Sequence, residues 1–316
     1  MIKKTHMTKE ERTIRNKKIW VGVKRDKHLY FMLIPPILFF LIFWLYPLYF
    51  LQIAFKDYKP FLGLAKSEWV GFDHFVTFFS SPYFGRTLKN TLMINIYSII
   101  FKFPAAIILA LLFNEVKNKI FVKVTQTVVY MPHFISSVVV AGMMITFLSP
   151  SSGFINQLIV KLGGESIYFL AEAKYFRAIY TIMGIWHEVG FSSIIFIAAL
   201  HAIDQDLYEA AKIDGAGKMA QVRYVTIPGI LPTIVIQLII AVGGIISVGY
   251  ETIILLYQPS TYETADVIST YVYRSGLQEG NYSFATAVSI FNSAVAILLV
   301  TVVNKISRKV NETSLW

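Results

Sequence analysis

The sequence predicts an all-α integral membrane protein with six membrane crossings, and three observations carry this prediction. The 316-residue chain is 55% hydrophobic and only 15% charged, which leaves too few charges for a soluble protein of this length. Six apolar stretches are each long enough for the roughly 20 residues that a helix needs to cross a bilayer. The net charge of +10 is concentrated in residues 1–28, which hold ten Lys or Arg. Such a basic segment is typical of the cytosolic side of an anionic membrane, so nucleic acid is not expected as a partner.

The first crossing follows the basic segment directly. Residues 29–55 contain no charged side chain. The stretch is longer than the roughly 7–15 residues of a signal-peptide core, and it lacks a small-residue cleavage site. We therefore expect it to remain as an N-terminal membrane anchor.

The five further crossings are expected at Leu88–Phe113, Thr127–Ser149, Arg177–Leu200, Gly229–Tyr257 and Phe284–Val303. An even number of crossings places both termini on one side. With both termini in the cytosol, the inside segments carry 19 Lys or Arg and the outside segments carry 7. The inside segments are then 1–28, 114–126, 201–228 and 304–316, and the outside segments are 56–87, 150–176 and 258–283. The positive-inside rule supports this orientation.

The outside segments differ in character. Residues 57–86 are rich in aromatic side chains, which predicts a structured cap at the membrane interface. Residues 149–153 are typical of a turn, and Gln157–Leu162 of a short surface helix. The last segment, 258–283, is rich in tyrosine. This composition fits an interfacial belt and a docking surface for an outside protein equally well.

A polar stretch between two very apolar ones is the most informative part of the chain. It reads EAAKIDGAGKMAQVRYVTIPGILP over Glu209–Pro232. Asp206, three residues ahead of Glu209, indicates a helix N-terminus, and Gly215 can supply the left-handed C-cap. A second short helix is expected to end at Pro228. Helices this short are unstable alone, so residues 201–228, called the elbow below, are expected to dock on a partner surface.

The elbow resembles the EAA loop of ABC-importer permeases. That pattern is Glu-Ala-Ala, three residues, Gly, nine residues, Ile, one residue and Leu-Pro. The matching residues are Glu209, Ala210, Ala211, Gly215 and Pro228. Val225 and Ile227 replace the Ile and Leu with similar apolar bulk. Asp214 and Ala216 extend the match in the form seen in the carbohydrate-uptake branch.

The resemblance implies a type I ABC-importer permease fold in the bacterial cytoplasmic membrane, with both termini cytosolic. Residues 88–303 would form the transport core, 29–55 an extra helix, and the elbow would dock on a cytosolic ATPase. The implied partners are a second permease chain that forms a heterodimer with this one, two cytosolic ATPase subunits and an extracytoplasmic solute-binding protein. The implied substrate is a carbohydrate, specifically an oligosaccharide. ATP and Mg²⁺ would be bound by the partner subunits.

The chain itself shows no catalytic motif. Gly215-Ala216-Gly217-Lys218 resembles a phosphate loop, but Lys212 stands where its first Gly belongs and Met219 where its hydroxyl belongs. Cysteine is absent, and the six histidines show no metal-binding spacing. We therefore expect a transport subunit rather than an enzyme, with no cofactor or metal of its own.

Three ionisable residues lie within predicted crossings: Lys102, Glu188 and Glu251. Each costs about 2.5–3.5 kcal/mol at membrane depth, which indicates function, although polar helix packing is an equal alternative for each. Trp186 and His187 stand beside Glu188, and an aromatic face next to hydrogen-bond acceptors suits a sugar. Counted from the outer helix ends, Lys102 and Glu188 lie roughly 21 and 16 Å deep, so we expect them to form an ion pair.

Two other functions remain open from the sequence. A secondary transporter or channel working alone would need a pathway of paired ionisable residues, and it would give the elbow no role. A membrane-embedded sugar enzyme would need carboxylates placed as acid and base near the interface. Stimulation of uptake by a co-expressed ATPase distinguishes the importer from both.

Overall fold

The computed structural model describes residues 17, 20–22, 24–246 and 248–311. The predicted basic segment 1–28 lies mostly outside these residues, as does the end of the segment 304–316. Within the described residues the fold is helical apart from one two-stranded hairpin, β1 (Lys56–Asp57) and β2 (Glu68–Trp69). Five described helices are long and apolar enough to cross a membrane, or six if a sharply bent pair is one span. The all-α class is therefore as expected.

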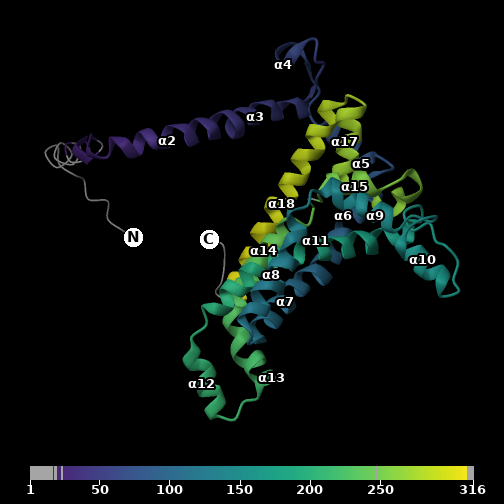
Figure 1. Ribbon diagram of the computed structural model, residues 1–316. Helices are drawn as coiled ribbons and strands as arrows, with labels where there is room; N and C mark the ends of the chain where they lie inside the picture. The colour runs from purple at the N-terminus through teal and green to yellow at the C-terminus, as the bar shows by residue number, and fades with distance from the viewer. Residues whose placement is uncertain (1–16, 18–19, 23, 247, 312–316) are drawn as a thin grey trace.

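The first crossing is an arm that leaves the bundle (Figure 1). It comprises α2 (Lys27–Phe40), η1 (Leu41–Leu45), α3 (Tyr46–Leu48) and η2 (Tyr49–Phe55), which together form one helical span. No side chain of α2, η1 or α3 is buried within the chain, and only η2 packs on the bundle, against α18 (Tyr282–Asn311). The apolar side chains of the arm are therefore left to contact lipid or another chain.

The second crossing is one continuous span that includes Pro104. It runs through α6 (Phe84–Tyr97), the π-helical turn η3 (Ser98–Lys102) and α7 (Phe103–Glu115). Pro104 lies in the first turn of α7, where the backbone hydrogen bond that proline cannot donate is least needed. The crossing packs along α11 (Ala173–His201), which is the fourth crossing.

The third crossing, predicted as the apolar segment Thr127–Ser149, is sharply bent. Two helical stretches meet there at 97°: Lys119–Phe134, made of α8 (Lys119–Tyr130) and η4 (Met131–Phe134), and α9 (Ser137–Phe147). Pro132 lies in η4, and the Ser136 hydroxyl accepts a hydrogen bond from the N–H of Val139 to begin α9. A proline followed by an N-cap serine ends one helix and starts another.

The fifth crossing, predicted at Gly229–Tyr257, is also interrupted. α14 (Ile227–Gly243) ends at two successive glycines, and α15 (Tyr250–Leu256) begins after Gly249. Residues 244–246 and 248–249 are not helical. The sixth crossing, α18, continues beyond the predicted end at Val303 to Asn311.

Close helix contact requires glycine at Gly190 in α11. A Cβ atom built there would lie 2.7 Å from the Val129 carbonyl carbon and 2.8 Å from Val129 Cγ1 in α8. Such distances are too short for real atoms, so glycine permits this approach of α8 to α11. The neighbouring core between α7 and α11 consists of Ala106, Ala110, Val189, Phe196 and Leu200.

The predicted aromatic cap is present at the end of the bundle opposite the elbow (Figure 1). It contains the β1–β2 hairpin, α4 (Gly63–Lys66) and α5 (Asp73–Ser80), and Phe55 packs on the rings of Trp69, Phe72 and Phe75. α10 (Phe154–Lys161) corresponds to the predicted surface helix. The remaining short helices near this end are η6 (Pro259–Thr261), α16 (Tyr262–Ala265), α17 (Ile268–Tyr273) and η7 (Arg274–Gln278).

Candidate functional site: a central cavity and an elbow

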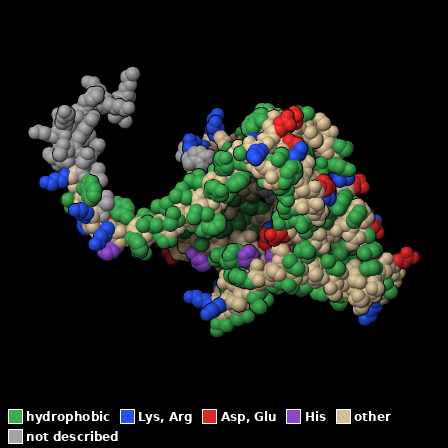
Figure 2. Space-filling model, turned by 90° about the horizontal axis from the view of Figure 1, so that it is seen from above, with side chains coloured by type: hydrophobic (Ala, Val, Ile, Leu, Met, Phe, Trp, Pro, Cys, Tyr) green, Lys and Arg blue, Asp and Glu red, His purple; other side chains and the backbone are tan. Residues whose placement is uncertain are grey.

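A cavity of about 1170 Å³ lies within the bundle. The view from above shows a hollow in the molecule with acidic side chains at its edge (Figure 2). The second crossing, α11, α14 and α15 form its walls. Polar side chains from all of these walls line it: Asn95, Ser98, Lys102, Tyr180, Glu188, Ser192, Gln237, Glu251 and Thr252. The aromatic rings of Phe103, Phe191 and Tyr250 also face it.

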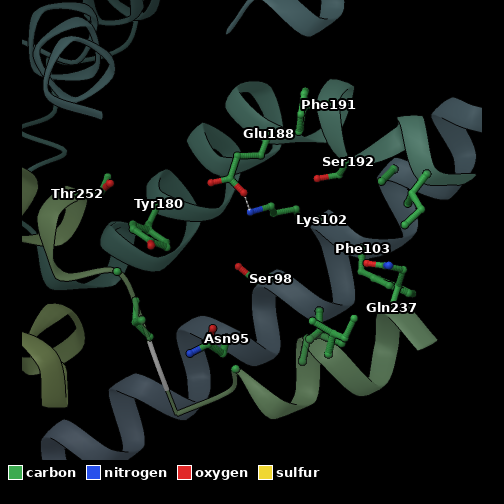
Figure 3. A pocket seen from close by; sticks show the side chains of 18 of the residues that line it. Asn95, Ser98, Lys102, Phe103, Tyr180, Glu188, Phe191, Ser192, Gln237 and Thr252 are labelled. Atoms are coloured by element: carbon green, nitrogen blue, oxygen red, sulfur yellow. Dashed lines mark hydrogen bonds and ion pairs between the residues drawn. The ribbon is translucent and has the colours of Figure 1, made fainter. Parts of the chain in front are cut away.

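The expected ion pair between Lys102 and Glu188 is present in the wall of this cavity (Figure 3). Lys102 ends the π-helical turn η3, and Glu188 lies near the middle of α11. The two side chains retain 26% and 41% of their exposure, so the pair faces the cavity rather than the packed core. The cavity thus offers one cation and one anion to a passing solute.

The interruption between α14 and α15 forms another wall. The Asn95 side-chain amide donates to the Ile245 carbonyl at 2.7 Å, and the Ser269 hydroxyl donates to the Val248 carbonyl at 2.7 Å. Irregular backbone at membrane depth is tolerated where side chains satisfy it and where it lines a cavity. This interruption carries Glu251 to the cavity at the start of α15.

Two of the sequence-predicted residues do not line the large cavity. Trp186 is 46% exposed and is absent from the cavity wall, because its position on α11 turns it toward the outside of the bundle. His187 Nε2 donates a hydrogen bond at 3.0 Å to the carbonyl oxygen of Ile135, at the bend between η4 and α9. His187 therefore fixes the bend to α11, and the aromatic faces of the cavity come from other residues.

A buried carboxylate near the cap end was not singled out from the sequence. The Asp266 side chain is fully buried, and it accepts hydrogen bonds from Arg86 at 2.8 Å and Arg274 at 3.0 Å. Its backbone carbonyl accepts from Asn90, whose side chain also accepts from Arg177. One cluster therefore joins the last outer segment to the second and fourth crossings. In the sequence, its one signal was the presence of Asp266 and Arg274 within the tyrosine-rich segment 258–283.

Asp266 stabilises the charged form of Arg274. Burial lowers the pKa of Arg274, but the hydrogen bonds and the charge of Asp266 more than offset this, and the pKa is raised overall. The guanidinium groups of Arg86 and Arg274 also lie over the ring of Tyr262, at 6.0 and 5.0 Å. The outer segment is thereby held on the bundle by charge and by cation–π contacts.

The elbow projects from the opposite end of the bundle (Figure 1). α12 (Gln205–Ile213) begins one turn before Glu209, and its N-cap is Asp204, which accepts from the N–H of Asp206 at 3.0 Å. The expectation that Asp206 begins the helix is thus wrong by two residues. The helix ends as predicted at Gly215, whose φ of 79° is left-handed. The N–H of Ala216 donates to Ala211 and that of Gly215 to Lys212, which is a Schellman motif.

The second limb of the elbow does not end at Pro228. α13 (Lys218–Gln221) continues through the π-helical turn η5 (Val222–Thr226) into α14, and Pro228 lies in the first turn of α14. Since η5 already rearranges the hydrogen-bond ladder, the missing N–H group of Pro228 is tolerated. The second limb of the elbow is therefore a helical continuation of the fifth crossing.

The structure places the EAA residues on the outer surface of the elbow. Glu209, Ala210, Asp214, Gly215, Ile227 and Pro228 are exposed, and Ala211, Ala216 and Val225 are half-buried. Several large apolar side chains of the elbow are also exposed: Leu207, Ile213, Met219 and Tyr224. The limbs are joined by a hydrogen bond from Tyr208 to Thr226 at 3.1 Å. An apolar, internally braced surface of this kind is typical of a docking site.

Comparison with known proteins decides the family. Residues 102–311 match the family described as binding-protein-dependent transport system inner membrane component. The chain belongs to this family. It is 44% identical to protein LplB of Bacillus subtilis (strain 168) over 298 residues, which are 94% of each chain. It is 42% identical to the polygalacturonan/rhamnogalacturonan transport system permease protein YteP of the same strain, over 96% of this chain and 94% of the relative.

Solved structures agree with this assignment. The fold superposes with a TM-score of 0.87 and 49% identity on a chain of a bacterial ABC transporter involved in the import of the acidic polysaccharide alginate. The match covers 93% of this chain and 99% of that chain. An equally similar chain comes from the alginate transporter in complex with an alginate pentasaccharide-bound periplasmic protein. The predicted type I permease fold is confirmed, and the chain is a permease of the multi-pass inner-membrane class.

Proposed function

We propose that this chain is the membrane-spanning permease subunit of an ABC importer that moves an oligosaccharide into the cytosol. The observation that carries the proposal is the elbow: an EAA sequence on a braced, exposed surface at the end of a bundle that encloses a polar cavity. A chain with no ATP-binding motif needs such a surface to receive energy from a partner.

The cavity supports a carbohydrate substrate. Its volume of about 1170 Å³ is larger than the roughly 300–1,000 Å³ of typical small-molecule sites, as an oligosaccharide requires. Aromatic rings offer apolar faces for pyranose rings, and the amide and hydroxyl side chains of the wall match sugar hydroxyl groups. Two similar proteins carry names that refer to polygalacturonan and alginate, which are acidic polysaccharides. A uronate carboxylate would compete with Glu188 for Lys102.

The arm supports a second permease chain as partner. Its 29-residue span is strongly apolar and leaves its own bundle, and no residue of its most apolar part is buried. A second permease can cover this arm, and a related but different chain would make a heterodimer. Two cytosolic ATPase subunits would bind ATP and Mg²⁺ below, and an extracytoplasmic solute-binding protein would deliver the sugar to the cap end.

The location follows from the charge distribution. The elbow carries Lys212, Lys218 and Arg223, and the N-terminal segment is strongly basic. The positive-inside rule then places the elbow and both termini in the cytosol of a bacterium and the aromatic cap outside.

Coupling is proposed to occur by rigid-body motion. Closure of the ATPases on ATP moves the elbow, and the elbow is continuous in helix with α14, a wall of the cavity. A displacement at the elbow therefore reaches the cavity without local unfolding. Alternation between outward and inward openings follows if the two permease bundles rock against each other.

Uptake of labelled oligosaccharide tests this function. Proteoliposomes holding this chain with its second permease and ATPases should accumulate the sugar only with ATP inside and the loaded binding protein outside. Accumulation that is unaffected by removing the ATPase subunits, and that follows an ion gradient instead, would establish a secondary transporter.

A further inference from the structure

A second, smaller cavity lies at the elbow end of the bundle and is lined by basic side chains. Its volume is about 340 Å³, and it lies among the end of α7, the start of α8 and the end of α11. Four of its lining residues carry basic groups: Lys117, Lys119, Lys123 and His201. None of its lining residues is acidic. We name it the basic pocket.

The three lysines of the basic pocket have no counter-ion in the described part of the chain. Among the residues that the structure describes, Lys117, Lys119 and Lys123 form no ion pair. The nearest carboxylate along the chain, that of Glu115, is bonded instead to Lys218 of the elbow at 2.8 Å. Three lysines thus line one concave site with no ion-paired carboxylate among the described residues.

The helix ends around the pocket do not neutralise these charges. α7 and α11 both end there, and each C-terminus carries roughly half a negative elementary charge. The N-terminus of α8 adds about half a positive charge, so the three lysines and the helix ends together leave a net charge of about +2.5 before His201 is counted. A singly charged phosphodiester would be attracted to such a site.

The surroundings indicate a lipid rather than a soluble anion. On α8, the basic side chains at positions 119 and 123 are one helical turn apart, and a stripe of exposed apolar side chains runs beside them. That stripe consists of Ile120, Phe121, Val124 and Val128, each at least 57% exposed. A basic face joined to an apolar face is the pattern of a helix at a membrane surface. The pocket also lies at the elbow end, where anionic headgroups attract basic residues.

We propose that the basic pocket binds the phosphodiester of an anionic phospholipid. Lys119 and Lys123 hold the phosphate from α8, Lys117 closes the site from the α7–α8 connection, and the acyl chains follow the apolar stripe of α8. Because the pocket joins α7, α8 and α11 beside the Glu115–Lys218 contact with the elbow, a bound lipid would brace this end of the bundle.

Native mass spectrometry of the full-length chain in detergent can test the site. Phosphatidylglycerol is titrated against phosphatidylcholine with the wild-type chain and with a Lys119→Gln/Lys123→Gln variant. Each basic residue near an anionic surface contributes about fivefold in affinity, so the variant should lose about 25-fold in phosphatidylglycerol binding. A Lys119→Arg/Lys123→Arg variant should keep it, which separates loss of charge from loss of folding.

A matched control removes the same charge elsewhere at the same end. Lys305 and Lys309 are also one helical turn apart, on α18, both are exposed, and neither lines the pocket. Lys305→Gln/Lys309→Gln should bind phosphatidylglycerol within about twofold of wild type. Equal losses in the two glutamine variants, or no preference for phosphatidylglycerol over phosphatidylcholine, would overturn the proposal. Displacement of the lipid by millimolar inorganic phosphate would show that a free phosphate, not a lipid, is the ligand.

Discussion

Substituting alanine for Gly190 should separate α8 from α11. The new Cβ atom would lie 2.7 Å from the Val129 carbonyl carbon, 0.7 Å short of the 3.4 Å at which ordinary contact begins. The obstacle is backbone, which cannot rotate away as a flexible side chain can. Overpacking of this kind costs about 1–3 kcal/mol. At about 2 °C per kcal/mol for a chain of this size, the thermal midpoint should fall by about 2–6 °C.

Gly184 provides the matched control on the same helix. A Cβ atom at Gly184 meets no atom within 4 Å. Gly184→Ala should therefore add up to about 1 kcal/mol of stability through helix propensity, and the thermal midpoint should rise slightly. The two variants thus shift the midpoint in opposite directions. Thermal unfolding of the purified variants in one detergent measures both shifts. A Gly190→Ala midpoint equal to or above that of Gly184→Ala would refute the close packing of α8 on α11.

Three further predictions concern charge and orientation. Lys102→Met and Glu188→Gln should each reduce uptake more than the double variant does, because each leaves one charge without its partner. A double-mutant cycle should give a coupling energy of about 0.5–3 kcal/mol. Additive losses would show that the two residues act independently. Asp266→Asn should cost about 3 kcal/mol of stability, measured by thermal unfolding, because two arginines lose a buried charged partner. As a control, Asp57→Asn removes an exposed pair with Lys59 and should cost at most about 1 kcal/mol. A single cysteine at position 215, in a chain with no native cysteine, should react with a maleimide only from the elbow side; labelling by an impermeant reagent added outside intact cells would reverse the orientation.

The features that were predicted correctly from the sequence are those that depend on neighbouring residues or on helix geometry. The elbow was found because its turn chemistry is local: the left-handed Gly215 and the short helices on either side follow from a few adjacent residues. The pair of Lys102 and Glu188 was found because helix rise converts residue number into depth.

The bends and the buried cluster depend on tertiary structure. Pro104 and Pro228 look like helix breaks in the sequence, but each falls in the first turn after a π-helical turn, so the helices continue.

The interruption after Gly243 had a sequence signal, two adjacent glycines within an apolar stretch, that was not used. Asp266 lies 180 residues from Arg86, and no local pattern joins them. Trp186 and Glu188 are two residues apart in sequence but lie on different faces of α11.

The most direct test of the central claim measures ATP hydrolysis that is stimulated by the loaded binding protein in the reconstituted transporter. Gly215→Asp places a side chain at φ 79°, which L residues rarely adopt, and should strain the elbow where it meets the ATPase. Gly217→Asp adds the same charge two residues away, at the N-cap of α13, where aspartate is favoured. We expect both variants to be folded and inserted in the membrane. Stimulated hydrolysis and uptake should fall at least tenfold further for Gly215→Asp than for Gly217→Asp. Wild-type stimulation and uptake by the Gly215→Asp transporter would contradict the role of the elbow in coupling.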